Sequence, residues 1–238
     1  MIRGILFDYG GTIDTDSVHW SEVLWQGFGA AGISVPKAYF RDAYVYGERT
    51  LARQPLIHPD HTMLDLLRIK VDIETRYLTE NRLWGASEAE RAARSEAVAC
   101  HCYAHVLFVL ETSREVIRRL AGRYPLVLVS NFYGNIQAIL RDFRLEYFQA
   151  VVESAVVGIR KPDPRIFQLG VDALGMNSHE VLVVGDSFSK DILPASSIGC
   201  PTAWIRGKGW ADENVDEALP TTILGSITQL ETWLQTAG

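Results

Sequence analysis

Residues 4–12 of the sequence read GILFDYGGT, an apolar run that leads into a glycine-rich loop carrying one acid, Asp8. A short apolar run bounded by turn residues is typical of a strand buried in a parallel sheet. Comparable runs recur at 126–129, 151–152, 181–184 and 203–205. Helices are predicted between and beside them at 135–143, 165–174 and 189–198. This alternation predicts βαβ units and an α/β fold, a Rossmann-like parallel sheet with helices on both faces.

Between the first and second of these strands, the pattern is helical throughout. Apolar residues at helical spacing predict helices at 17–31, 36–54, 61–83 and 88–110. Ser87 and Glu90 form a capping-box pattern before the last of them, and Thr112 with Glu115 forms another before a predicted helix at 113–123. We therefore expect a core domain made of residues 1–15 and 111–238. An all-helical cap domain, residues 16–110, is inserted after its first strand.

Composition narrows the class of protein. The 238 residues are 47% hydrophobic and 22% charged, which is typical of a globular chain. The net charge of −6 and the lack of a basic run disfavour a nucleic acid partner. No stretch reaches the roughly 18 apolar residues of a membrane span, and the start resembles a strand more than a signal peptide. With only three cysteines, the expected location is cytoplasmic; the oligomeric state stays open.

Polar residues follow the predicted strands where each one ends. Asp8 follows the first strand, Ser130-Asn131 the second, Lys161 the third, and Asp186, with Asp191 five residues later, the fourth. Ligands of open α/β sheets bind beyond the carboxyl ends of the strands, so these side chains should converge. Lysine is scarce in this chain, which gives Lys161 added weight: the five lysines are Lys37, Lys70, Lys161, Lys190 and Lys208.

This set of side chains suits phosphoryl transfer through a carboxylate. Asp8 would attack phosphorus and form an aspartyl-phosphate. Mg²⁺ and Lys161 would offset the repulsion between that carboxylate and the phosphate. Ser130 and Asn131 would donate hydrogen bonds to the transferring oxygens, which gain charge in the transition state.

Four ordered motifs resemble those of the haloacid dehalogenase-like (HAD-like) hydrolase superfamily. They are FDYGGT at 7–12, LVLVSN at 126–131, RKPDPRIF at 160–167 and VVGDSFSKD at 183–191. The insertion point after the first motif resembles the helical-cap (C1) class, and the set resembles its phosphatase/phosphoglucomutase-like branch. Any one motif alone would be weak, but four in order are specific.

The resemblance implies a role for each matching residue. Asp8 is expected as the nucleophile and Lys161 as its charge partner. The other expected roles are phosphate binding by Ser130, Asn131 and Gly11, Mg²⁺ binding by Asp8, the Gly10 carbonyl and Asp186, and support from Asp191 and Thr12. Asp191 could contact the metal or only orient the loop and Lys161, and the sequence leaves both roles open. The implied activity is Mg²⁺-dependent hydrolysis of a small phosphorylated metabolite.

Position 10 departs from the family's phosphatases, which carry a second aspartate there as general acid and base. Gly10 keeps the carbonyl but removes a group typically worth ~10²–10⁴ in rate. The substrate could have a leaving group that needs little protonation, or Asp14, Asp16, His19 or a cap residue could act as the acid. Phosphonatase-like C–P hydrolysis, which needs a cap lysine, and a binding protein without turnover are the alternatives.

Two further observations bear on the metal. The family's dehalogenases also lack the second aspartate but work without metal, so retention of Asp186 and Asp191 favours phosphorus chemistry. Cys100-His101-Cys102 with His105 resembles a zinc-binding pattern. On a helix, however, the two histidines share a face that the cysteines do not, so packing is the preferred interpretation.

Overall fold

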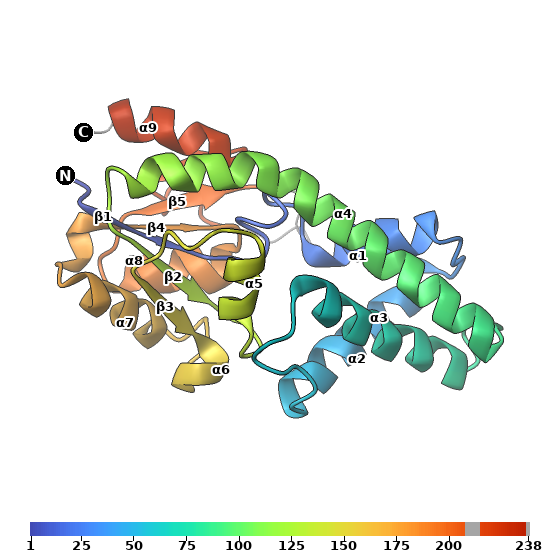
Figure 1. Cartoon of the computed structure of the whole chain (residues 1–238). Helices are drawn as coiled ribbons and strands as arrows, with labels where there is room; N and C mark the ends of the chain where they lie inside the picture. The colour runs from blue at the N-terminus through green and yellow to red at the C-terminus, as the bar shows by residue number, and fades with distance from the viewer. Residues whose placement is uncertain (208–214, 237–238) are drawn as a thin grey trace.

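The computed structural model describes residues 1–207 and 215–236, and its strands form one parallel sheet in the order β3-β2-β1-β4-β5-β6 (Figure 1). The strands are β1 (Gly4–Phe7), β2 (Leu126–Ser130), β3 (Ala150–Glu153), β4 (Val181–Gly185), β5 (Thr202–Ile205) and β6 (Thr222–Leu224). The five predicted strands are confirmed, and β6 was not predicted. The first strand, β1, lies between β2 and β4 in the sheet.

Successive residues of each central strand face opposite layers, as the twofold period of a strand requires. Ile5 and Phe7 belong to one buried cluster, whereas Leu6 between them belongs to the other. Helices α7 (Arg165–Leu174) and α8 (Leu193–Ser197) pack on the Leu6 side. The opposite layer contains the end of α4, α5 and α9, so the sheet is covered on both faces.

The helices follow the predicted pattern closely. Those between β1 and β2 are α1 (Trp20–Ala30), α2 (Lys37–Arg53), α3 (Met63–Glu80) and α4 (Glu88–Ala121). Those of the second half are α5 (Ile136–Asp142), α6 (Ser154–Val157), α7, α8 and α9 (Leu230–Thr236), with 3₁₀ turns at Ser178–Glu180 and Ile227–Gln229. The helix predicted at 189–198 is instead a π-helical turn, Phe188–Ile192, followed by α8.

One helix prediction was wrong. The helices expected at 88–110 and 113–123 are a single helix, α4. Ser87 caps its start as predicted, its hydroxyl accepting a hydrogen bond from the Glu90 N–H at 3.2 Å. Thr112 begins no helix, because α4 continues through this residue without a break. The chain therefore enters the sheet domain within a helix, and the domain boundary near residue 110 stays a prediction.

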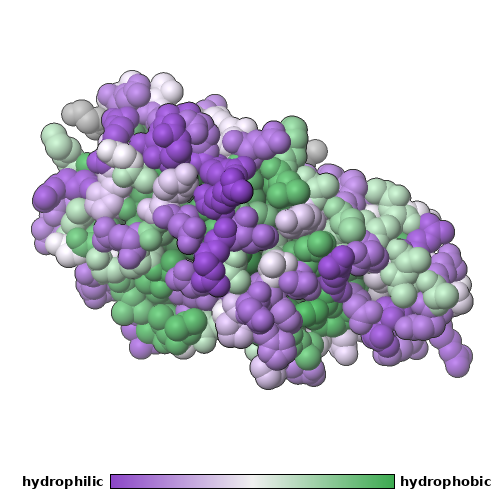
Figure 2. All heavy atoms as spheres, in the orientation of Figure 1, coloured by the Kyte–Doolittle hydropathy of each residue, from purple (hydrophilic) through white to green (hydrophobic). Residues whose placement is uncertain are grey.

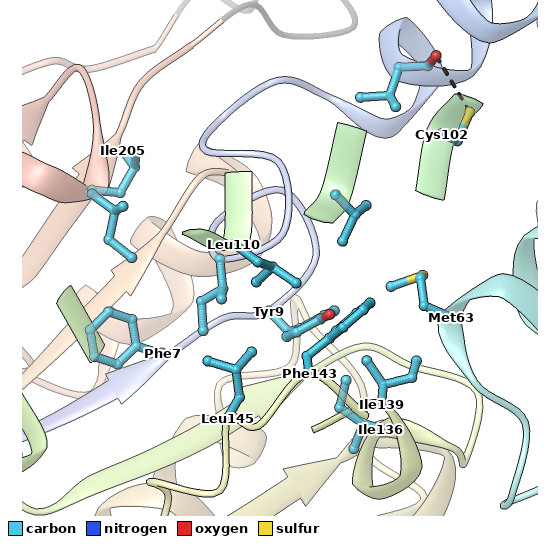
Figure 3. Close-up of a cluster of buried hydrophobic side chains, with 14 of the residues drawn as sticks. Phe7, Tyr9, Met63, Cys102, Leu110, Ile136, Ile139, Phe143, Leu145 and Ile205 are labelled. Carbon is cyan, nitrogen blue, oxygen red and sulfur yellow. Dashed lines mark hydrogen bonds between the residues drawn. The ribbon is translucent and has the colours of Figure 1, made fainter. Parts of the chain in front are cut away.

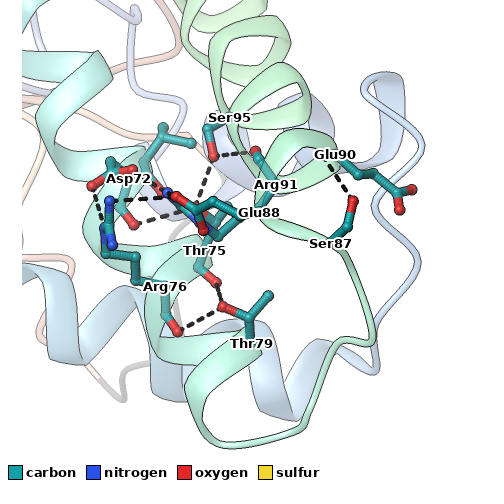
Figure 4. Close-up of polar contacts among 10 residues, drawn as sticks. Asp72, Thr75, Arg76, Thr79, Ser87, Glu88, Glu90, Arg91 and Ser95 are labelled. Carbon is teal, nitrogen blue, oxygen red and sulfur yellow. Dashed lines mark hydrogen bonds and ion pairs between the residues drawn. The ribbon is translucent and has the colours of Figure 1, made fainter.

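The helical segment and the sheet domain share one hydrophobic cluster. Figure 3 shows Met63 of α3 near Phe143 and Ile139, beside the Tyr9 ring that follows β1. At the other end of this segment, Arg91 is buried between α3 and α4 (Figure 4). It donates to Asp72 at 2.6 Å and to both carboxylate oxygens of Glu88. The segment is thus held by apolar packing on one side and charged hydrogen bonds on the other.

The outer surface is polar over most of the face in Figure 2, with hydrophobic residues in separate patches. Among the described residues, no helix combines the length and the apolar character that a membrane crossing needs.

The continuity of α4 predicts a large effect of proline at its centre. Glu111 is exposed, so its side chain is dispensable, and Glu111→Ala should change stability little. Glu111→Pro should lower the free energy of unfolding by about 3 kcal/mol or more, because the ring removes a hydrogen bond and clashes with the preceding turn. Urea unfolding of the two variants measures the difference. Equal stabilities would mean that the helix is interrupted here.

Candidate active site

The parallel strands bring polar residues from four distant segments to one cavity of about 670 Å³. Asp8 follows β1, Ser130 ends β2, and Asp186 follows β4. Lys161 comes from the loop after α6 and Asp191 from the π-helical turn after β4. Because β1 is flanked by β2 and β4, the side chains beyond these three strands must lie together at the carboxyl edge of the sheet.

Lys161 is the central cation of the site. Its side chain is only 2% exposed, and its ammonium donates to Asp8 Oδ1 at 2.5 Å and to Asp191 Oδ1 at 2.7 Å. Asn131 fixes the Lys161 backbone by accepting from its N–H at 2.9 Å and donating to its C=O at 3.1 Å. The sequence assigned Asn131 to phosphate binding; the structure gives its amide a role in positioning Lys161.

Asp191 acts as an internal support. One of its oxygens accepts from Lys161, and the other accepts from the Ser187 N–H at 3.0 Å. Both oxygens therefore have protein donors, which fits orientation of Lys161 better than direct metal binding. The sequence had left these two roles equally open.

Asp8 and Asp186 lie in a negatively charged environment. Asp8, Asp186 and Asp191 can each place one oxygen within 4.8 Å of the others. Burial raises the pKa of Asp8 to about 6, with Lys161 opposing and Asp191 adding to the rise. Burial and the charges of Asp8 and Asp191 raise the pKa of Asp186 well above its usual range. Three carboxylates share one ammonium, so the cluster fits a divalent cation that binds oxygen ligands.

Hydroxyl groups complete the cluster. Thr12 Oγ1 lies 3.3 Å from Asp8 Oδ2 and 3.4 Å from Asp186 Oδ1, and Ser130 Oγ lies 3.5 Å from Asp8 Oδ1. These long contacts leave both hydroxyls able to turn toward a bound group. All the residues assigned from the sequence, Gly10 and Gly11 included, therefore lie at or beside this cluster.

The two loop glycines differ in what the backbone requires of them. Gly11 has a φ of +97°, and a Cβ there would lie 2.3 Å from Asp186 Oδ2. Position 11 therefore needs glycine. A Cβ on Gly10 would meet only the Trp20 ring, at 3.8 Å or more. The missing carboxylate at position 10 is therefore not the result of steric exclusion at Cβ.

Of the three acids suggested near this loop, only one lines the cavity. Asp14 is buried, with its oxygens accepting from the Gly11 N–H at 2.7 Å and from Trp20 Nε1 at 3.0 Å. Burial raises the pKa of Asp14 to about 7, yet the group serves to close the loop. Asp16 binds Ile227 and Ser226 near the C-terminal helix. His19 lines the cavity.

Sequence reasoning missed the cap's contribution to the cavity. Glu48 of α2, Lys70 of α3 and Tyr133 from the loop after β2 line it together with Asp8. One signal was available, since three of the five lysines, Lys70, Lys161 and Lys190, line the cavity. The cysteine–histidine pattern has no such place. Cys100 is exposed, and Cys102 is buried against the Val23 carbonyl.

The parallel sheet thus carries a buried aspartate, a lysine and an acidic cluster at its carboxyl edge. A sequence model of the haloacid dehalogenase-like hydrolase family matches residues 2–199, and the chain belongs to this family.

The relatives include both phosphatases and dehalogenases. A glyceraldehyde 3-phosphate phosphatase from Pyrococcus abyssi is 31% identical over 90 residues, 38% of each chain. An (S)-2-haloacid dehalogenase from Pseudomonas putida is 26% identical over 134 residues, 56% of this chain and 58% of the relative. The match thus spans well under two thirds of these relatives. The HAD-hydrolase YfnB from Bacillus subtilis, solved bound to magnesium, shares the fold with a TM-score of 0.61 at 21% identity over 98% of both chains.

Substitution by alanine should have different effects at the two adjacent glycines. Gly11→Ala should lower Mg²⁺ affinity roughly tenfold or more, because the new methyl group displaces Asp186, and the positive φ should cost about 1–2 kcal/mol of stability. Gly10→Ala should leave both nearly unchanged. Titration calorimetry with Mg²⁺ and thermal unfolding of the two variants test this. Equal losses in affinity would contradict the assigned packing.

Proposed function

We propose that this protein hydrolyses a small phosphorylated metabolite by transferring the phosphoryl group to Asp8. The observation that carries the proposal is the convergence of Asp8, Lys161, Ser130 and Asp186 in one cavity, from four separate segments. A family that includes phosphatases supports the same chemistry.

The donor set fits Mg²⁺. Asp8 and Asp186 supply carboxylate oxygens, the Gly10 carbonyl is available on the same loop, and one lysine leaves the three carboxylates with excess negative charge. Bound Mg²⁺ would neutralise charge on the carboxylates and on the phosphate. The magnesium bound by the Bacillus subtilis hydrolase, which shares this fold, supports the same choice of ion.

The chain's own residues supply the nucleophile and orient the phosphate. An oxygen of Asp8 attacks phosphorus, forming an acyl phosphate bond as the bond to the leaving oxygen breaks. Lys161 holds Asp8 in place and offsets its charge, and Ser130 donates to a phosphate oxygen. Attack by water then releases phosphate and regenerates Asp8.

Gly10 directs the proposal toward leaving groups that depart as stable anions. No carboxyl group stands at this position, and Asp14 and Asp16 are bound elsewhere. A carboxylate or phosphate leaving group needs little protonation, whereas an alkoxide needs much. Acyl phosphates and phosphoanhydrides are therefore the preferred substrate class.

The position of Lys70 bears on the phosphonatase alternative, which requires a cap lysine near phosphorus. Lys70 does line the cavity. However, it forms an ion pair with Glu48. Burial alone would lower the pKa of Lys70, but the charge of Glu48 and the neighbouring acidic groups outweigh this effect and raise the pKa well above its usual range. A Schiff base forms from a neutral amine, so a lysine held as a cation favours the phosphatase.

Turnover should depend on both Mg²⁺ and Asp8. A panel of phosphorylated metabolites should be hydrolysed with Mg²⁺ and not with chelator, and Asp8→Asn should lower the rate by on the order of 10³-fold or more. Acid quenching during turnover should trap one phosphoryl group on Asp8, detected by mass spectrometry. Turnover that survives chelation would rule out the metal. A native protein that binds phosphate without turnover would be the binding relative.

The rate should fall steeply as the pKa of the leaving group rises. Acetyl phosphate and pyrophosphate should be cleaved much faster than sugar phosphates, because an unassisted alkoxide must carry the developing charge. Gly10→Asp, whose Cβ the loop accommodates, should flatten this dependence and raise the rate on alkyl phosphates. Gly10→Asn is the matched control and should not. A flat dependence in the native protein would show that another residue already donates the proton.

A further inference from the structure

Glu48 and Lys70 of the cap and Tyr133 of the loop after β2 form a polar cluster in the wall of the cavity. Lys70 donates to Glu48 Oε1, and the Tyr133 hydroxyl donates to Glu48 Oε2 at 3.1 Å. The Lys70 ammonium also lies 4.7 Å from the centre of the Tyr44 ring. Because Tyr133 follows Ser130 and Asn131 in one loop, the cluster joins the cap to the phosphate end of the cavity.

This cluster is a poor device for stability alone. Burying an ion pair costs desolvation free energy that the attraction between the charges often fails to recover. The surrounding helices offer apolar alternatives, since Leu51 and Leu67 line the same cavity. A charged pair at this position is better explained by contact with a polar ligand.

Glu48 is the more exposed member of the pair, and it lines the cavity. Its side chain is 37% exposed, whereas that of Lys70 is 5% exposed. Burial raises the pKa of Glu48, but Lys70 and Tyr133 outweigh burial and hold it below its usual range. Each carboxylate oxygen has one protein donor and can accept a further hydrogen bond. Lys70 fixes and neutralises the carboxylate from behind.

We infer that Glu48 determines specificity by accepting a hydrogen bond from a hydroxyl or ammonium group at the far end of the leaving group. The substrate class is then a phosphorylated metabolite with a hydrogen-bond donor at that end, in preference to a second anion. This inference rests on the proposed function, because it takes the phosphate to lie at Asp8.

The other charged groups around the cavity are consistent with this assignment. Arg53, Arg160 and Lys190 line it but are exposed, so they attract the phosphate dianion from the solvent side. Glu74, behind the cluster, is fully buried, and neither of its carboxylate oxygens has a hydrogen-bond partner among the described residues. Burial raises the pKa of Glu74 to about 8, so at neutral pH this carboxyl is mostly protonated and Glu48 is the anion that pairs with Lys70.

Four probes of equal length separate the chemistry of the far end from that of the phosphate. They are 2-aminoethyl, 2-hydroxyethyl, propyl and carboxymethyl phosphate, ending in ammonium, hydroxyl, methyl and carboxylate. Titration calorimetry on Asp8→Asn protein with Mg²⁺ measures binding without turnover. The ammonium and hydroxyl probes should bind more tightly than propyl phosphate, and the carboxylate probe most weakly. Equal affinities for the four probes, or tightest binding of the carboxylate probe, would overturn the inference.

Glu48→Gln, made in the same Asp8→Asn protein, should reduce the preference for ammonium over methyl by roughly tenfold or more, because a hydrogen bond to a charged acceptor is lost. Tyr133→Phe is the matched control. It removes one donor to Glu48 but keeps the carboxylate, so the order should persist. If Glu48→Gln unfolds in thermal scans, Glu48→Gln with Lys70→Met leaves no unpaired charge, and the preference should again collapse. An unchanged order in a folded variant overturns the inference.

Inorganic phosphate distinguishes this inference from the proposed function. Protein that binds phosphate but none of the four esters lacks the subsite, although Asp8 could still be phosphorylated by other compounds. Protein that shows the expected order, yet no turnover with Asp8 intact, retains the subsite and contradicts only the proposed hydrolysis.

Discussion

The repulsion among buried carboxylates is the constraint on which the rest of the site depends. Two unit charges 4 Å apart repel by about 4 kcal/mol at an effective dielectric constant of 20, so Asp8, Asp186 and Asp191 would not all stay ionised without cations. Lys161 satisfies part of this demand, and its position is fixed by Asn131 from the neighbouring strand end and by Asp191 itself. Lys161 thus pairs with Asp8 and Asp191 at once, and each of these charged groups keeps the others in position.

The sheet makes this network possible. A parallel strand ends where its neighbour ends, so residues far apart in sequence meet at one edge without a dedicated loop to join them. The strands are buried on both faces, as the alternation of Ile5, Leu6 and Phe7 between two clusters shows. A rigid scaffold of this kind keeps like charges close, because local relaxation would have to disrupt the core.

Local patterns predicted most of this, and the failures have a common cause. Asp8, Lys161 and Asp186 were predictable because strand ends are marked by short apolar runs and strand topology then places them. The break near Thr112 was predicted wrongly because a capping pattern lies on the exposed side of a helix that packing on both domains keeps continuous. Glu48 and Tyr133 could not be found, because only the docking of the cap onto the sheet decides which face of α2 meets the cavity.

The structure distinguishes the adjacent glycines Gly10 and Gly11 by the room each leaves for a side chain. In the sequence, both look like turn glycines, and no local pattern tells which of the two positions the backbone requires to be glycine. In the structure, Asp186 excludes a side chain at position 11, whereas position 10 has room beside the Trp20 ring.

The Trp20 ring is fixed by its hydrogen bond to Asp14, which also closes the loop through the Gly11 N–H. The space beside Gly10 is therefore bounded by an indole ring whose N–H already donates to Asp14. Since the backbone does not demand glycine there and no carboxylate is present, the proposed reaction must take its polar contacts to the leaving group from other residues. Glu48 and Tyr133, placed on opposite sides of the junction between cap and sheet, are groups of that kind.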